Sequence, residues 1–191
     1  MALIKPNNNT ISAITALPAG VGGKVLQVVG NVLNDAMDAT GTEDTQYNIQ
    51  GGGGVFETAM TIASGSKVHV NYMFHIGTDS ENSNVGLLVK AKVDSGSYAD
   101  VELADANGNR TRQFSTASRA ATEGAGGYWL QNISGNVLFT PSGSGSRVVT
   151  VKFMLQNRAS GNRRIYNNYS HANDDDSVVT VSTCTLMEVG S

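Results

Sequence analysis

The three histidines and an acidic run are the side chains of this sequence best suited to bind a metal ion. His69 and His75 stand six residues apart in an alternating segment, and His171 lies far along the chain. Six residues of strand place His69 and His75 on one side, about 20 Å apart, too far to share an ion. Solvated histidines are favoured, with one histidine from each subunit around a trimer axis as the alternative. The aspartates at 174–176 lack the spaced ligands of a calcium loop. We predict no metal and no cofactor.

A cluster of arginines and tyrosines is the second candidate site. Arg163 and Arg164 are followed closely by Tyr166 and Tyr169. Guanidinium groups bind acidic groups, and aromatic rings stack on other rings and on cations. These four residues are the candidate outward-loop contacts for a surface glycan, although the role of ordinary exposed residues of a hairpin is favoured over binding. The aromatic pair at 128–129 is a further sugar platform candidate, although packing in the core or at an interface is favoured there.

Catalytic patterns are missing from the sequence. It contains no Ser-His-Asp spacing, no His-Glu-x-x-His and no phosphate-binding glycine loop. The single cysteine, Cys184, lies in an apolar segment, which is typical of a small buried side chain. We therefore predict that the protein is not an enzyme. Paired carboxylates from distant loops can cleave glycans, so a glycan-cleaving enzyme is the alternative from another class.

Alternating segments of β-branched residues predict the elements that carry these side chains. The strongest alternation runs over residues 67–76, and other strands are expected over 85–93, 147–155 and 177–189. Turn signals recur at the spacing of a sandwich. The sequence predicts an all-β, antiparallel jelly-roll sandwich, with an immunoglobulin-like sandwich as the alternative. Residues 30–45 are expected to form a loop or a brief helix between Val32 and Met37. The glycines at 51–54 are expected to form a loop or a place where another chain comes close.

Two Ser/Gly-rich turns have similar sequences. IASGSKVHV at 62–70 and PSGSGSRVVTV at 141–151 each join a turn to a basic residue and a long strand. We predict that they form equivalent corners of one sandwich. The longest polar loops are expected at 77–84, 115–127 and 167–176.

The first 23 residues are predicted to be a docking arm with a glycine joint, and residues 24–191 the jelly-roll domain. Pro6 and Pro18 break regular structure in the arm. Between them, Ile11, Ile14 and Leu17 recur at a spacing of three, and we predict that they dock on another subunit of a larger assembly.

Charge and hydropathy exclude several classes of protein. The chain has 191 residues, a net charge of −3 and only 15% charged residues. Such a balance does not form the basic footprint of a nucleic-acid-binding protein. No apolar run reaches the roughly 20 residues that span a bilayer, and the start lacks the pattern of a secretory signal, so no membrane insertion is expected.

Short motifs along nearly the whole chain resemble those of known structural proteins. They are KPNNNTI at 5–11, GKVLQVV at 23–29, NGNRTR at 107–112, LFTP at 138–141, the strand from Val148, YNN at 166–168 and STCTLMEV at 182–189. In this order they resemble structural proteins of tailed bacteriophages, notably of phages that infect cyanobacteria.

The resemblance implies a jelly-roll virion protein that is usually trimeric and has no catalytic residues. We expect a non-enzymatic homotrimeric tail-fibre or spike-type appendage on the particle exterior, involved in host attachment. A decoration protein that stabilises the head is the alternative. The expected partners are copies of the chain, other capsid or tail proteins and a host surface glycan, without nucleic acid.

Overall fold

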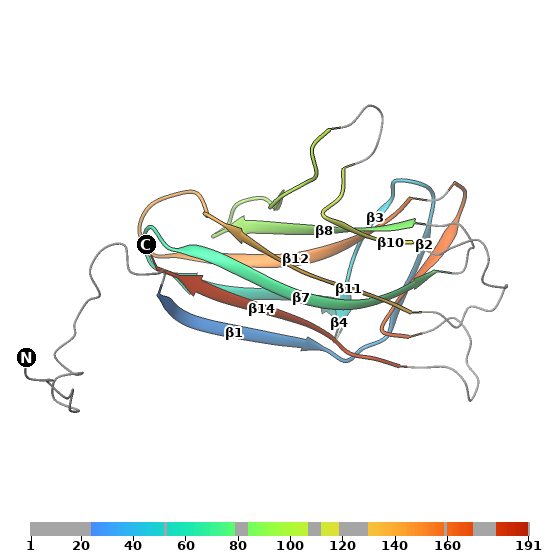
Figure 1. Cartoon of the computed structure of the whole chain (residues 1–191), viewed down its shortest axis with the longest axis horizontal. Helices are drawn as coiled ribbons and strands as arrows, with labels where there is room; N and C mark the ends of the chain where they lie inside the picture. The colour runs from blue at the N-terminus through green and yellow to red at the C-terminus, as the bar shows by residue number, and fades with distance from the viewer. Residues whose placement is uncertain are drawn as a thin grey trace, which may run out of the picture.

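The computed structural model describes residues 24–51, 53–78, 84–106, 112–118, 130–158, 160–169 and 179–190 (Figure 1). Within these ranges the chain forms fourteen β-strands and no helix. All pairings between the strands are antiparallel. The predicted all-β class is confirmed. The predicted arm, with Ile11, Ile14 and Leu17, lies outside the described residues.

Sheet A has six strands but is four strands wide, because two of its four positions each hold two shorter strands that follow one another. Its strands are β1 (Val25–Leu33), β2 (Met37–Gly41), β7 (Lys67–Thr78), β11 (Gln131–Phe139), β13 (Arg163–Asn167) and β14 (Ser182–Val189). β14 and β13 pair with successive parts of one edge of β7, and β11 pairs with the other edge. β1 and β2 follow each other along the outside of β14 and β13.

Sheet B is built in the same way. Its strands are β3 (Gln46–Asn48), β6 (Glu57–Ile62), β8 (Asn84–Val93), β9 (Ala99–Asp100), β10 (Ser115–Ser118) and β12 (Arg147–Asn157). β12 and β8 form the centre, β6 and β3 share the free edge of β12, and β9 and β10 share that of β8. A small hairpin of β4 (Gln50–Gly51) and β5 (Gly54–Val55) joins β3 to β6.

The strand order is that of a jelly roll. When pieces that continue one another are counted together, sheet A has the order 1-8-3-6 and sheet B the order 2-7-4-5 along the chain. Strand 1 pairs with strand 8, 2 with 7, 3 with 6 and 4 with 5, as in one long hairpin that has been rolled up. The predicted jelly roll is therefore confirmed, and the immunoglobulin-like alternative, which has another strand order, is excluded.

The two Ser/Gly turns are equivalent corners, as predicted. Each carries the chain from one sheet to the other, from β6 to β7 and from β11 to β12. The rolled hairpin places them side by side, and the Gly145 backbone N–H donates to the Ser64 hydroxyl at 3.3 Å. Arg147 is buried behind its corner and donates to the carbonyl oxygens of Gly145 and Pro141.

The core lies between the two sheets. The strict alternation of β7 buries Val68, Val70, Tyr72, Phe74 and Ile76. On β12 the alternate residues from Val149 to Leu155 face them, and the Phe74 and Phe153 rings meet with centroids 4.7 Å apart. Burial of each such side chain contributes about 1.5–3 kcal/mol, and this core is what holds the two sheets against each other.

The region between Val32 and Met37 departs from the prediction. Instead of a loop or brief helix, β1 continues to Leu33, and β2 starts at Met37 after a short break. Asn168 stabilises the chain at this break, because its side-chain amide donates to the carbonyl oxygens of Leu33 at 2.8 Å and Asp35 at 3.1 Å. Asn168 adopts the left-handed conformation, with φ of 65°, which asparagine tolerates better than most residues.

Two loop expectations were also wrong in part. The glycines at 51–54 are not a plain loop, because Gly51 and Gly54 pair in the small hairpin. Residues 115–118, expected in a loop, form β10 because the edge of β8 offers them backbone partners. Of the expected loops at 77–84 and 167–176, residues 79–83 and 170–176 lie outside the described residues.

Candidate functional surfaces

The histidines that the structure describes are side chains on the outer face of sheet A. His69 and His75 both point away from the core, as the alternation predicted. His75 is held in place by polar neighbours, because its Nδ1 lies 3.0 Å from the Val181 carbonyl and its Nε2 lies 3.4 Å from the Asn132 amide. No group of three His, Cys, Asp or Glu side chains able to hold a metal ion occurs in the described ranges. His171 and the aspartates at 174–176 lie outside them.

Cys184 lies in the core, as predicted. Its side chain belongs to the buried cluster, and only 1% of the residue is exposed. Burial raises the pKa of the thiol to about 11, against which a hydrogen bond with Thr58 acts only weakly. Since the thiolate is the reactive form, Cys184 is not a nucleophile at neutral pH.

The structure brings together most of the arginine–tyrosine cluster. β13 positions Arg164 so that its Nε donates to the Asp38 carboxylate of β2 at 2.7 Å. The Arg164 guanidinium also lies 5.4 Å from the centre of the Tyr166 ring, and the Tyr169 ring meets Tyr166 edge-on. The Arg164 hydrogen bond lowers the pKa of Asp38, with help from Tyr169 and against a smaller effect of burial.

The four residues of the cluster differ in how far they are exposed to solvent. Tyr166 is 1% exposed and is a packing residue beneath the others. Arg164 and Tyr169 are partly exposed and form the accessible part of the cluster, whereas Arg163 is also partly exposed but points to the opposite face of β13, because successive strand residues alternate. Sequence reasoning missed Asp38, which neutralises Arg164. The only local signal was an acidic residue within a segment not recognised as a strand.

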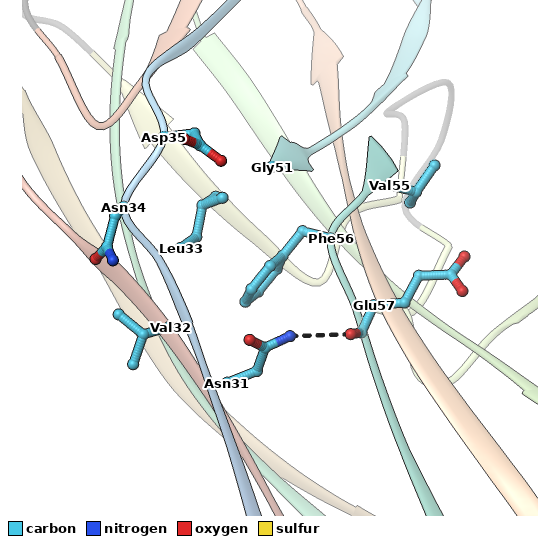
Figure 2. A pocket seen from close by; sticks show the side chains of 9 residues that line it. All are labelled: Asn31, Val32, Leu33, Asn34, Asp35, Gly51, Val55, Phe56 and Glu57. Atoms are coloured by element: carbon cyan, nitrogen blue, oxygen red, sulfur yellow. Dashed lines mark hydrogen bonds between the residues drawn. The ribbon is translucent and has the colours of Figure 1, made fainter. Parts of the chain in front are cut away.

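A shallow hollow lies where β1 ends against the small hairpin (Figure 2). It has a volume of about 350 Å³, and its lining includes Phe56, Asn34 and Asp35. The Asn31 amide spans its rim by donating to the Glu57 carbonyl at 3.0 Å. Figure 2 shows the carboxylates of Asp35 and Glu57 on opposite sides of the hollow in this view. The polar, open lining forms no paired-carboxylate constellation around a common point.

The outer face of sheet B is charged. Lys90 and Lys152 stand directly opposite each other on β8 and β12, an arrangement that is unfavourable unless each lysine has a partner. Lys90 pairs with Asp100 at 2.8 Å, and Lys152 lies 4.2 Å from the centre of the Tyr98 ring. Burial raises the pKa of Tyr98, and the neighbouring Glu57 carboxylate raises it further. Each of the two lysines therefore has a partner within the chain, a carboxylate for Lys90 and an aromatic ring for Lys152.

The outer face of sheet A is largely uncharged. The strand register places Val28, Met187, His69 and Leu138 in one row across its four strands. Val28 is 56% exposed and Leu138 51% exposed, so none of the described residues covers the two ends of this row. A second row has Val32 at its edge, also 56% exposed, followed by Thr183, Met73 and Ser134.

Comparison with known proteins gives only weak similarities. No family model and no curated protein matches the chain. One structure of infectious bursal disease virus, of the Gx strain, is similar over 86% of this chain, with 8% identity and a TM-score of 0.43. A structure of the Gt strain is similar over 87%, with 11% identity and a TM-score of 0.30. This chain spans 37% and 43% of those two chains. Similarity this low carries no argument about function.

None of the described residues belongs to a helix long and apolar enough to cross a bilayer.

Proposed function

We propose that this chain is a non-enzymatic structural protein of a virus particle. The observation that carries the proposal is the jelly-roll strand order, combined with an exposed sheet face that is almost free of charge. A disulfide-free sandwich with a well-filled aromatic core suits a protein that must persist outside a cell. The order of the sequence motifs that resemble phage structural proteins supports the same role.

The finer proposal is a homotrimeric tail-fibre or spike-type appendage of a tailed bacteriophage, on the particle exterior and involved in host attachment. Arg163, Arg164 and Tyr169 are its proposed contacts with a host surface glycan. Their partial exposure and mixed cationic and aromatic character support this part of the proposal. Ile11, Ile14 and Leu17 are the proposed docking residues toward the rest of the particle.

Immunogold electron microscopy of intact particles, with an antibody against the folded domain, tests the location. Label at the tail is expected for an attachment appendage. Label over the head would instead support the second candidate, a head decoration protein, which the small size of the sandwich and its uncharged sheet face favour. If particles from a virus that encodes this chain carry no label, the virion role itself is overturned.

Two sets of variants test the finer roles. Replacement of Arg163, Arg164 and Tyr169 by alanine is expected to reduce particle adsorption to host cells, whereas Arg112→Ala, at an exposed site before β10, is not. Deletion of residues 2–20 is expected to stop incorporation into particles. Normal adsorption or normal incorporation would contradict the respective role.

A further inference from the structure

The two outer faces of the sandwich differ sharply in charge. On sheet B, lysines from β8 and β12 stand among acidic partners and beneath Tyr98. On sheet A, the outward positions of β1, β14, β7 and β11 hold one formally charged residue, Lys67, at the end of the face. The remaining positions are aliphatic residues, methionines, small polar residues and the two histidines. The same chain thus solvates the outer face of sheet B with charges and leaves the part of sheet A formed by β1, β14, β7 and β11 nearly without them, while the Arg164–Asp38 ion pair lies beyond this part on β13 and β2.

The composition of this face matches the centre of a protein interface. Interface centres are depleted of Lys, Glu and Asp and enriched in Met. Val28, Val32 and Leu138 are more than half exposed, although the sheet brings them into rows with Met187 and Met73. Isolated exposed valines are ordinary, but here apolar side chains recur across the sheet, with three of the four residues in the first row apolar and two of the four in the second.

The area of the face is sufficient for association. Four strands at about 4.8 Å spacing span roughly 19 Å, and nine residues at about 3.3 Å cover roughly 26 Å along β7. The planar area is therefore about 500 Å² per copy, or about 1,000 Å² for two copies. That value reaches the roughly 1,000 Å² expected of a specific interface.

The charge pattern also indicates which partner fits. When a surface meets another copy of itself, its charges are brought toward like charges, which costs several kcal/mol for each close pair. A face without charges avoids this penalty, and it offers nothing to attract an acidic or basic partner. A second copy of this chain is the occupant that these properties favour.

We propose that the outer face of sheet A is the surface through which copies of this chain pack on one another. This inference rests only on the proposal that copies of the chain assemble with one another, and not on the trimer, because a face that packs on the same face of another copy forms a two-fold contact. The apolar rows ending at Val28 and Leu138 form the centre of the contact, and the charged outer face of sheet B stays exposed to solvent.

The test measures the molar mass of the full chain by sedimentation across a wide range of concentrations. Val28→Arg and Leu138→Arg place a charge at either end of the central row. Val148→Arg is the matched control, since Val148 is 41% exposed on the outer face of sheet B. All three sites are exposed, so thermal unfolding of the dissociated variants is expected to match that of the dissociated wild type.

The wild type is expected to be oligomeric, and each face variant to associate at least about 30-fold more weakly, because a buried unpaired charge costs 2 kcal/mol or more. Val148→Arg is expected to associate like the wild type. Oligomers that persist unchanged in both face variants would overturn the proposal, as would equal dissociation of the control.

A monomeric wild type would also overturn it. If the face of that monomer then bound an apolar dye only after removal of residues 2–20, the arm would be its occupant instead. These results are distinct from failure of the virion role, which is judged by labelling of particles and not by mass in solution.

Discussion

Glu188 provides the sharpest test of how the sandwich is held together at its first corner. The residue is 4% exposed, near the end of β14. One carboxylate oxygen accepts the backbone N–H of Ala63 at 2.7 Å, and the other accepts the Gln27 side-chain amide at 2.8 Å. The Ser66 hydroxyl also donates to it. A single carboxylate thereby joins β14, β1 and the turn between β6 and β7.

Glu188→Gln keeps the shape of this side chain but replaces one acceptor oxygen with an NH₂ group. That NH₂ group then faces a hydrogen-bond donor instead of accepting from it. Hydrogen bonds to a charged group contribute about 1.5–3 kcal/mol, and the variant loses at least one of them. We expect a loss of about 1.5–3 kcal/mol in the free energy of unfolding at neutral pH. At about 2–4 °C per kcal/mol for a chain of this size, the melting temperature falls by roughly 3–12 °C.

The effect of this substitution depends on pH. Burial raises the pKa of Glu188, but the hydrogen bonds from Ser66, the Ala63 N–H and Gln27 together outweigh burial, so the pKa lies below its ordinary value. A carboxyl group with a lowered folded pKa stabilises the protein above its unfolded pKa of about 4.3, and this stabilisation is lost as the pH falls through the folded pKa. The difference in the free energy of unfolding between wild type and variant should therefore be constant from neutral pH to about pH 5. Below about pH 5 this difference should shrink toward zero.

Urea unfolding of both proteins from acidic to neutral pH, at one fixed protein concentration, measures the gap. Glu102→Gln is the control, because Glu102 is exposed after β9 and its replacement is expected to leave the midpoint unchanged. Equal midpoints for wild type and Glu188→Gln at neutral pH would refute the reasoning. A gap that stays the same in acid would show that packing, and not the ionised carboxylate, is responsible.

Three other residues give direct predictions. A Cβ at Gly135 would lie 2.6 Å from the Tyr72 hydroxyl, so Gly135→Val should cost about 1–3 kcal/mol in urea unfolding, whereas Gly30→Ala, with open space around it, should cost almost nothing. Cys184 should resist a thiol reagent at pH 8 in the folded protein and react after unfolding, and rapid reaction of the native protein would contradict its burial. Asn168→Ala should cost about 2–4 kcal/mol, since the hydrogen bonds that hold the end of β1 are lost at a positive φ. Asn168→Gly should recover about 1 kcal/mol of this loss by relieving the backbone, and equal midpoints for the two variants would rule out a backbone contribution.

The long strands could be predicted because their period is local. β7 and β12 show the alternation in their own residues, and the structure buries the expected faces. β2 and β10 could not be predicted in this way. Their sequences, MDATG and STAS, are short and polar, and each becomes a strand because β13 or β8 supplies a hydrogen-bonding edge.

The candidate contacts illustrate the same division. The sequence grouped Arg163, Arg164, Tyr166 and Tyr169 because they are close in the chain. The structure shows Tyr166 buried and Arg164 paired with Asp38, which lies 126 residues away in sequence. Such a pair leaves no local pattern, since it is created by the antiparallel pairing of β13 with β2.

The sequence by itself determined the all-β class, the inward faces of the long strands and the burial of Cys184, because strand periodicity and apolar content act locally. It also marked the two Ser/Gly turns as equivalent. Only the tertiary structure decided that these turns touch, that Glu188 joins three segments, and that uncharged positions from β1, β14, β7 and β11 gather on one face. The physical reason is the rolled hairpin: its pairings join the first strand to the last, and hydrogen bonds between residues so far apart depend on the register of the whole sheet.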